Sequence, residues 1–117
     1  MLEPPIFQII PNDKVRLLKD WQINETLIIP CGYESDLGSV PKFFWWFLHP
    51  NDITYSSIIH DYEWELADLG KYSFFEGNKS FLKNSIELDK IQPYKAYICY
   101  SALEVVRIHK FFKFKHD

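Results

Sequence analysis

The sequence lacks the features that would assign it to several common protein classes. Its two cysteines, Cys31 and Cys99, form no C-x-x-C pair, so neither a metal knuckle nor a redox motif is indicated, and we expect two reduced, packed thiols. The formal charge of -3, from 13 basic and 16 acidic residues, gives no general attraction for nucleic acid, which is not expected as a partner. No internal repeat, low-complexity tract or flexible linker is found.

Long apolar runs are also missing. Residues Met1–Pro5 do not have the basic start and apolar stretch of a secretory signal, so we expect a cytoplasmic protein. The most apolar run, Phe43–Leu48, is far shorter than the ~20 residues that cross a bilayer. What is abundant is aromatic residues, at 18% of a chain whose 117 residues suffice for one core. We predict a single domain, 1–117, with one site at most.

The N-terminal part has the composition of β-structure. Apolar and β-branched residues fill Ile6–Ile10, Val15–Ile23 and Thr26–Ile29, with turn-forming residues between them. They predict a three-stranded antiparallel meander in which Asn24-Glu25 links a hairpin. A sheet this small needs helices on one face. The predicted fold class is therefore α+β, with the N-terminal meander packed against three to four helices.

Helical patterns begin after the glycine-flanked loop that contains Gly38. Pro41 suits a first helical turn, and Gly70 suits the left-handed residue that ends a helix. Asn51 or Asp52 is expected to cap the helix that Gly70 ends. The predicted helices span Lys42–Leu48, Ile53–Leu69, Phe75–Leu88 and Pro93–Phe114.

A candidate polar site lies in the helix expected at 53–69. The tetrapeptide His60-Asp61-Tyr62-Glu63 places charged groups among aromatic residues, where burial is costly unless each group has a partner or a task. Asp61, Glu65 and Asp68 share one stripe of this helix, and His60 lies near its boundary with the apolar side. Such a stripe is either a solvated face or a site for a hard cation such as Mg²⁺, Ca²⁺ or Mn²⁺.

Two catalytic mechanisms fit these residue types. In the first, Asp36, His60 and Asp61 hold a divalent metal ion (Mg, Mn, Ca or Zn) that activates water, and Glu65 or Asp68 takes the proton.

In the second, Ser39 is the nucleophile, His60 its base and Asp36 the orienting carboxylate. We favour the metal, because Asp36 and Ser39 are three residues apart and would have to reach opposite nitrogens of one ring. The spacing of Asp36 and Ser39 equally suits local turn and capping bonds, which would make the polar motif structural.

The aromatic run Phe43–Phe47 has two interpretations. A helix that is apolar all round is usually buried, which favours core packing. Alternatively, Trp45 and Trp46 anchor the chain to a membrane surface or a protein partner.

The segment Gly32–Pro41, followed at a distance by Ile59-His60-Asp61-Tyr62, resembles a family of short bacterial and bacteriophage proteins known only as domain of unknown function 1353. That family shows D-x-[AG]-S-[VI]-P and then H-D-Y, and the resemblance covers roughly residues 26–112. The family pattern continues as H-D-Y-L-Y and has a downstream Ala-Asp pair, where this chain has Glu63-Trp64 and Gly77-Asn78. If that aspartate belongs to a site, Asn78 is a neutral ligand in its place and cannot act as a base.

The resemblance implies a phage or prophage origin, with the protein in the host cytoplasm or the virion, and a small α+β domain. The leading hypothesis is a metal-assisted hydrolase with an Asp/His/Asp site. A second is a non-catalytic virion or host-interaction protein in which the polar motif is a structural hydrogen-bond network. A third is a peripheral membrane-associated module.

Overall fold

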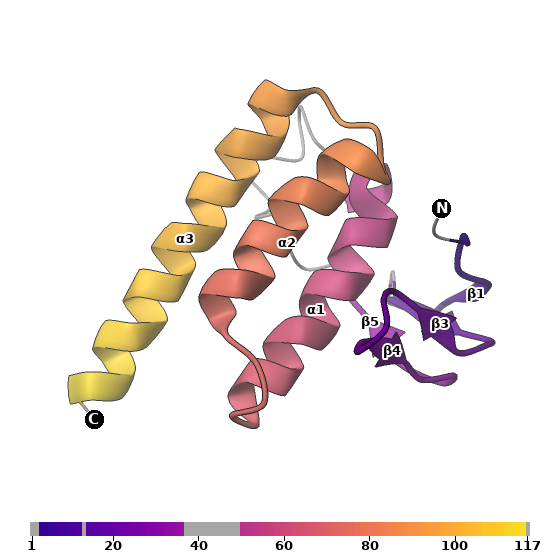
Figure 1. Ribbon diagram of the computed structural model, residues 1–117, viewed down its shortest axis with the longest axis horizontal. Helices are drawn as coiled ribbons and strands as arrows, with labels where there is room; N and C mark the ends of the chain where they lie inside the picture. The colour runs from indigo at the N-terminus through magenta and orange to yellow at the C-terminus, as the bar shows by residue number, and fades with distance from the viewer. Residues whose placement is uncertain (1–2, 13, 37–49, 117) are drawn as a thin grey trace.

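The computed structural model describes residues 3–12, 14–36 and 50–116. Its three α-helices lie side by side, with α2 in the middle, and the strands gather beside α1 (Figure 1). The predicted α+β fold class is confirmed. The elements in chain order are β1 (Phe7–Ile10), β2 (Lys14–Leu17), β3 (Trp21–Gln22), β4 (Ile28–Ile29), β5 (Glu34–Ser35), the 3-10 helix η2 (Pro50–Ile53), α1 (Thr54–Asp68), α2 (Phe74–Glu87) and α3 (Pro93–His116).

The strands pair differently from the predicted meander. The three-stranded antiparallel sheet has the order β1-β2-β5, and β3 pairs with β4 in a separate two-stranded sheet. The strand expected at Val15–Ile23 is therefore two strands, and the third strand of the sheet is Glu34–Ser35, which was expected to be loop. The hairpin across Asn24 is confirmed, with Trp21 opposite Ile29. Asn24 Oδ1 accepts from the backbone N–H groups of Thr26 and Leu27, which closes this turn without glycine.

Two apolar clusters hold these elements together. In the first, alternate strand residues such as Val15 and Leu17 face α1 and pack on Ile58 and Ile59. In the second, Ile53 and Phe81 pack against Cys99 and Leu103 of α3. Helix α1 is thus buried on both sides, which explains why its middle carries so few exposed residues.

The first turn of α1 is capped by a residue that is distant in sequence. Neither Asn51 nor Asp52 caps it as predicted, because the N-cap position is Ile53, whose side chain forms no capping bond. Asp89, which follows α2, takes this role: Oδ1 accepts from the N–H of Tyr55 at 3.2 Å and Oδ2 from the N–H of Ser56 at 2.9 Å. Burial raises the pKa of Asp89, and the hydrogen bonds from Ser56 and Tyr55 oppose this rise.

Gly70 ends α1 as predicted, since its φ of 76° is the left-handed conformation that glycine adopts without strain. Both cysteines are free, which agrees with the prediction of reduced thiols. Cys99 is buried among the helices, but the prediction of a packed thiol was wrong for Cys31, which lies at the surface.

Several predicted features lie outside the described residues: Ser39, the aromatic helix Lys42–Leu48, and with it Trp45 and Trp46. Among the helices of the described part, none is long and apolar enough to cross a membrane.

Candidate functional site

His60 lies at the buried end of a polar network that joins the three helices. Its side chain is buried, with 3% of the residue exposed, rather than at the boundary of the acidic stripe where the sequence placed it. Phe81 of α2 and Trp64 one turn along α1 pack against the ring, with centroid separations of 5.4 and 5.0 Å. Nε2 of His60 is 2.7 Å from Oδ1 of Asn78, which α2 contributes.

The amide of Asn78 fixes the tautomer of His60. The indole Nε1–H of Trp64, which can only donate, points to the same Oδ1 atom at 3.1 Å. On its other side, Nδ2 of Asn78 donates to Oε1 of Glu104 at 3.1 Å. The amide oxygen therefore faces His60 and accepts two hydrogen bonds, so Nε2 of His60 must carry a hydrogen and donate it.

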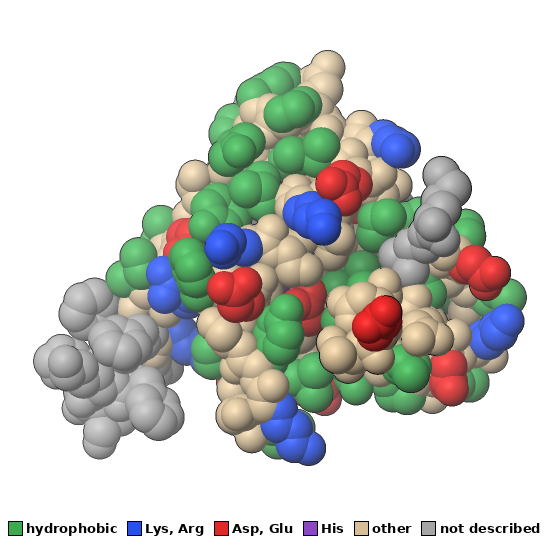
Figure 2. Space-filling view, in the orientation of Figure 1, with side chains coloured by type: hydrophobic (Ala, Val, Ile, Leu, Met, Phe, Trp, Pro, Cys, Tyr) green, Lys and Arg blue, Asp and Glu red, His purple; other side chains and the backbone are tan. Residues whose placement is uncertain are grey.

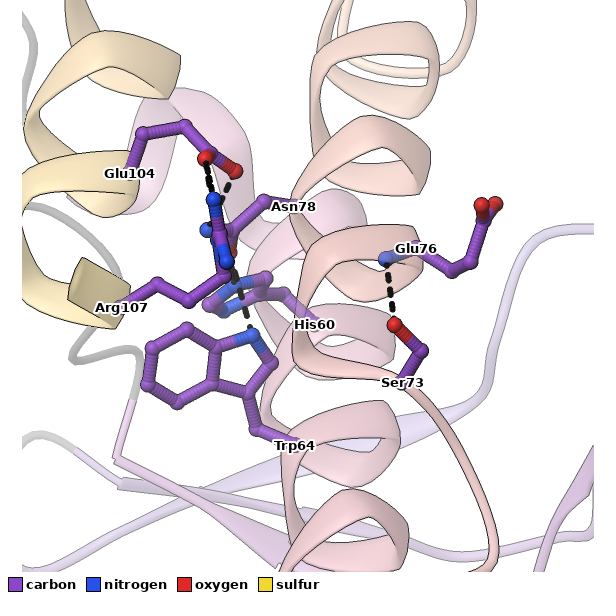
Figure 3. Close-up of polar contacts among 7 residues, drawn as sticks. All are labelled: His60, Trp64, Ser73, Glu76, Asn78, Glu104 and Arg107. Carbon is purple, nitrogen blue, oxygen red and sulfur yellow. Dashed lines mark hydrogen bonds and ion pairs between the residues drawn. The ribbon is translucent and has the colours of Figure 1, made fainter. Parts of the chain in front are cut away.

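Glu104 of α3 connects the buried part of the network to Arg107, nearer the surface. Its Oε2 atom accepts from Nε and Nη2 of Arg107 at 2.9 and 2.6 Å. Figure 3 shows these side chains converging from the three helices, with Asn78 between His60 and Glu104. Burial alone would raise the pKa of Glu104, but the hydrogen bonds from Arg107 and Asn78 hold it below its usual value. The outer end of the network is charged, and its inner end is neutral.

The environment of His60 makes it a weak base. Burial lowers its pKa from 6.5 to about 4, although the hydrogen bond with Asn78 opposes the shift. A general base works best when its pKa lies near the operating pH. At neutral pH this imidazole is uncharged and ready to accept a proton, but its affinity for that proton is low.

Two of the positions that depart from the family pattern are in contact with each other. A Cβ atom added at Gly77 would lie 3.0 Å from Cδ1 of Trp64, a tighter contact than most Cβ atoms make, so the indole would have to shift. Glycine at this position thus makes room for the indole, and the indole in turn donates to Asn78, the next residue of α2. This side of the site therefore depends on three residues that contact one another: Trp64, Gly77 and Asn78.

A pocket of about 440 Å³ lies beside this network, and we call it the acidic pocket. His60 and Trp64 are part of its wall, together with Tyr33 and Lys14 from the strand region. The remaining charged groups that line it are all carboxylates: Glu34, Asp36, Asp61, Glu65 and Asp68. This excess of negative charge favours a cation in the pocket.

Partners constrain some of these carboxylates. Oδ2 of Asp61 accepts a hydrogen bond of 2.5 Å from Ser35, a buried residue of β5, so this contact ties the sheet to α1. Arg16 pairs with Glu34 at 3.1 Å, and Lys110 pairs with Asp68 at 3.1 Å. Burial, together with the nearby charges of Asp61 and Glu65, raises the pKa of Tyr33, which stays a neutral phenol.

The structure brings most of the predicted site residues to this pocket. Asp36, His60, Asp61 and Glu65 all line it, and Asp68 lies at its edge with α3. Among the described residues, no group of three histidine, cysteine or acidic side chains has the arrangement needed to hold a metal ion. Ser39, the predicted nucleophile, lies outside the described residues.

Sequence reasoning missed the partners of the motif residues. We expected Asp36 to serve His60, but the residue bonded to Nε2 is Asn78, which the sequence singled out only as a substitution for aspartate. Glu104 and Arg107 form an ion pair, and their i, i+3 spacing on one face of the last helix was the available signal for it. Nothing in the sequence pairs that face with Asn78.

Comparison with known proteins identifies a family without an assigned activity. The family model described as "Protein of unknown function (DUF1353)" matches residues 15–103, which include the H-D-Y motif and Asn78. No curated protein and no solved structure gives a match.

Proposed function

The chain belongs to the DUF1353 family, and from its geometry we propose that it is a non-catalytic interaction protein whose acidic pocket binds a lysine or arginine side chain of a protein partner. The observation that carries this proposal is the hydrogen bonding of His60. Its ring is buried, its Nε2–H is bonded to Asn78, and its low pKa makes it a poor proton acceptor. These properties suit a residue that fixes the helices beneath a binding surface.

The walls of the acidic pocket suit a cationic group. Asp36 and Glu65 contribute carboxylates, and Tyr33 and Trp64 contribute aromatic rings. An ammonium or guanidinium group gains from carboxylates through charge-assisted hydrogen bonds and from aromatic faces through cation–π attraction. Given the phage or prophage origin that the family resemblance implies, the partner would be a virion or host protein.

The test uses acetyl-arginine-amide as the probe and backbone amide chemical shifts as the readout. We expect saturable shifts at Tyr33, Asp36 and Glu65, and weaker binding as salt is raised, because exposed charges are screened over ~8 Å at physiological ionic strength. Glu65→Gln should weaken binding about fivefold, which corresponds to the ~1 kcal/mol of one exposed charge pair.

Matched controls separate specific recognition from general attraction of cations. Acetyl-citrulline-amide has nearly the shape of the arginine probe but no charge, and it should not bind. Glu87→Gln removes an exposed carboxylate of α2 that does not line the pocket, and it should leave binding unchanged. Equal binding of both probes, or equal effects of both substitutions, would contradict the proposal.

A second candidate is the metal-assisted hydrolase, and one observation favours it. Asp36, His60, Asp61 and Glu65 come from separate segments or turns yet line one pocket, so a divalent ion would meet oxygen and nitrogen donors there. Oxygen donors suit Mg²⁺, Ca²⁺ or Mn²⁺, and an imidazole adds Zn²⁺ as a possible ion. Because Nε2 of His60 is engaged by Asn78, only Nδ1 could coordinate the metal.

Metal titration distinguishes the two candidates. A bound ion at a hundredfold excess over its dissociation constant stabilises the folded protein by ~2.7 kcal/mol, which thermal unfolding detects readily. For the hydrolase, one of Mg²⁺, Mn²⁺, Ca²⁺ or Zn²⁺ should give this shift, and Asp36→Asn should remove it. For the interaction protein, none of the four ions should give it, while the arginine probe still binds.

A further inference from the structure

A second pocket, of about 470 Å³, lies where the loop after α1 meets the beginning of α2 and the last part of α3. We call it the aromatic pocket, because Tyr72, Phe74 and Phe75 line it. Two cations of α3, Arg107 and Lys110, also line it, as does one carboxylate, that of Asp68. Figure 2 shows basic side chains between the lower turns of α3 and the start of α2, with hydrophobic side chains beside them. Its volume is within the range of small-molecule sites.

The aromatic rings hold both cations at the pocket. The guanidinium carbon of Arg107 is 5.1 Å from the ring centroid of Phe75, and Nζ of Lys110 is 5.0 Å from that of Phe74. Both distances are within cation–π range. Phe75 is 41% exposed, so its ring remains available to a ligand. The pocket therefore presents an apolar surface and positive charge together.

Each cation keeps hydrogen-bond donors for a ligand. Arg107 uses Nε and Nη2 for Glu104, and the described residues offer no partner to its Nη1 atom. Lys110 contacts Asp68 at 3.1 Å with one of its three N–H groups, and nearly half of its side chain is exposed. Two anchored cations with unused donors are the arrangement that binds a carboxylate.

We propose that the aromatic pocket binds a small carboxylate with an aromatic or aliphatic body. The carboxylate contacts Arg107 Nη1 and Lys110 Nζ, and the apolar body packs on Phe74 and Phe75. The two parts of the ligand match the two parts of the wall, since a bare anion would leave the rings exposed and an uncharged ring would leave the unused N–H groups of both cations without an acceptor. This site shares Asp68 with the acidic pocket but is lined by two cations, whereas the acidic pocket has an excess of carboxylates.

The experiment uses phenylacetate as the probe and backbone amide shifts as the readout. Saturable shifts are expected around Phe74, Phe75 and Lys110 below ~20 mM, the range for a ligand of ten heavy atoms with ordinary efficiency. Lys110→Gln should weaken binding roughly tenfold through loss of a charge-assisted hydrogen bond. Phe75→Ala should weaken it as well, because the apolar body loses its contact surface.

Three controls make the result decisive. Lys83→Gln removes an exposed cation of α2 that lies outside the pocket, and it should not change binding. Acetate tests the need for the apolar body, and benzylamine tests the need for negative charge. Binding of phenylacetate with shifts at these residues, and not of acetate or benzylamine, supports the proposal. Benzylamine binding as well as phenylacetate, unchanged affinity in Lys110→Gln, or no shifts at all overturns it.

Discussion

Two buried polar residues of α1, about one turn apart on the side that meets α2, differ in their hydrogen bonding. His60 is 3% exposed and bonded to Asn78, which is bonded in turn to Trp64 and Glu104. Glu63 is 1% exposed, and neither of its carboxyl oxygens forms a hydrogen bond with a described residue. The comparison separates a polar group that stabilises the helix packing from one that opposes it.

Burial shifts the pKa of each residue towards its neutral form, which means opposite directions for a base and an acid. Burial lowers the pKa of His60 to about 4, so the neutral imidazole persists well below its ordinary titration range. Burial raises the pKa of Glu63, and the nearby hydroxyls of Tyr72 and Ser80 lower it only in part. Burying a neutral histidine therefore costs little free energy when its hydrogen bonds are made within a network. Burying the Glu63 carboxyl without hydrogen bonds keeps the full cost of removing it from water.

The largest effect that separates His60 from Glu63 is expected from Asn78→Ala. This change removes the acceptor for His60 and Trp64 and the donor for Glu104, so one buried and two part-buried side chains each lose a hydrogen bond. At ~1–3 kcal/mol for each unsatisfied group, with some relaxation, we expect a loss of about 3–5 kcal/mol in the free energy of unfolding. Urea denaturation followed by circular dichroism measures it.

Asn84→Ala is the matched control, because Asn84 lies on the same helix, is half-buried and donates one hydrogen bond to Ser80. It should cost less than about 1 kcal/mol. Similar losses in the two variants would mean that the His60 network adds nothing special to the helix packing.

The pH dependence of stability tests directly how buried His60 contributes to the free energy of unfolding. Because the pKa of His60 is lower in the folded state than its ordinary value of 6.5, the unfolded chain binds the proton more tightly. Stability from this residue is fully present above pH 6.5 and is lost as the pH falls towards 4. A fall in the pKa from 6.5 to about 4 corresponds to about 3 kcal/mol of stability.

Urea midpoints measured between pH 7 and pH 4 report this loss, and His60→Gln should flatten the slope. An equal slope in that variant would assign the acid sensitivity to other groups, such as the paired carboxylates of the acidic pocket.

Sequence patterns predicted the helices better than the strands, for a physical reason. The helices at 54–68 and 74–87 carry their own signals, namely apolar spacing and the left-handed Gly70. Strand β5, Glu34–Ser35, has two polar residues and no such signal. Its position depends on pairing with β2 and on the bond from Ser35 to Asp61, contacts between residues distant in sequence.

The sequence predicted residues that line the candidate site, but it did not predict the hydrogen bonds between them. Asp36, His60 and Asp61 were expected to converge, and they do line one pocket. The partner of His60 could not be deduced, because the register between two helices decides that Asn78 faces it. Local sequence patterns predict which side of each helix is buried. Which buried sides contact each other depends on packing across the whole core.

The smallest effect, and the one of opposite sign, is expected from Glu63→Leu. Leucine fills a similar volume without a carboxyl that lacks hydrogen bonds, so the variant should be more stable by ~1–2 kcal/mol. The direction of the pKa shift of Glu63 also predicts how the effect of this substitution on stability changes with pH. Since the folded pKa of Glu63 is raised, its neutral form is tolerated at low pH, and stability is lost as the pH rises through that pKa. The advantage of leucine should therefore grow with pH.

Glu87→Leu provides the control for this variant, because Glu87 is an exposed residue at the end of α2, where substitutions usually change stability by less than ~0.5 kcal/mol. If Glu63→Leu is instead destabilising at neutral pH, then the hydroxyls of Tyr72 and Ser80 satisfy the carboxyl in solution, and Glu63 is hydrogen-bonded like His60. If it stabilises the protein and the gain increases with pH, the contrast between a bonded histidine and an unbonded glutamate accounts for how α1 packs on α2.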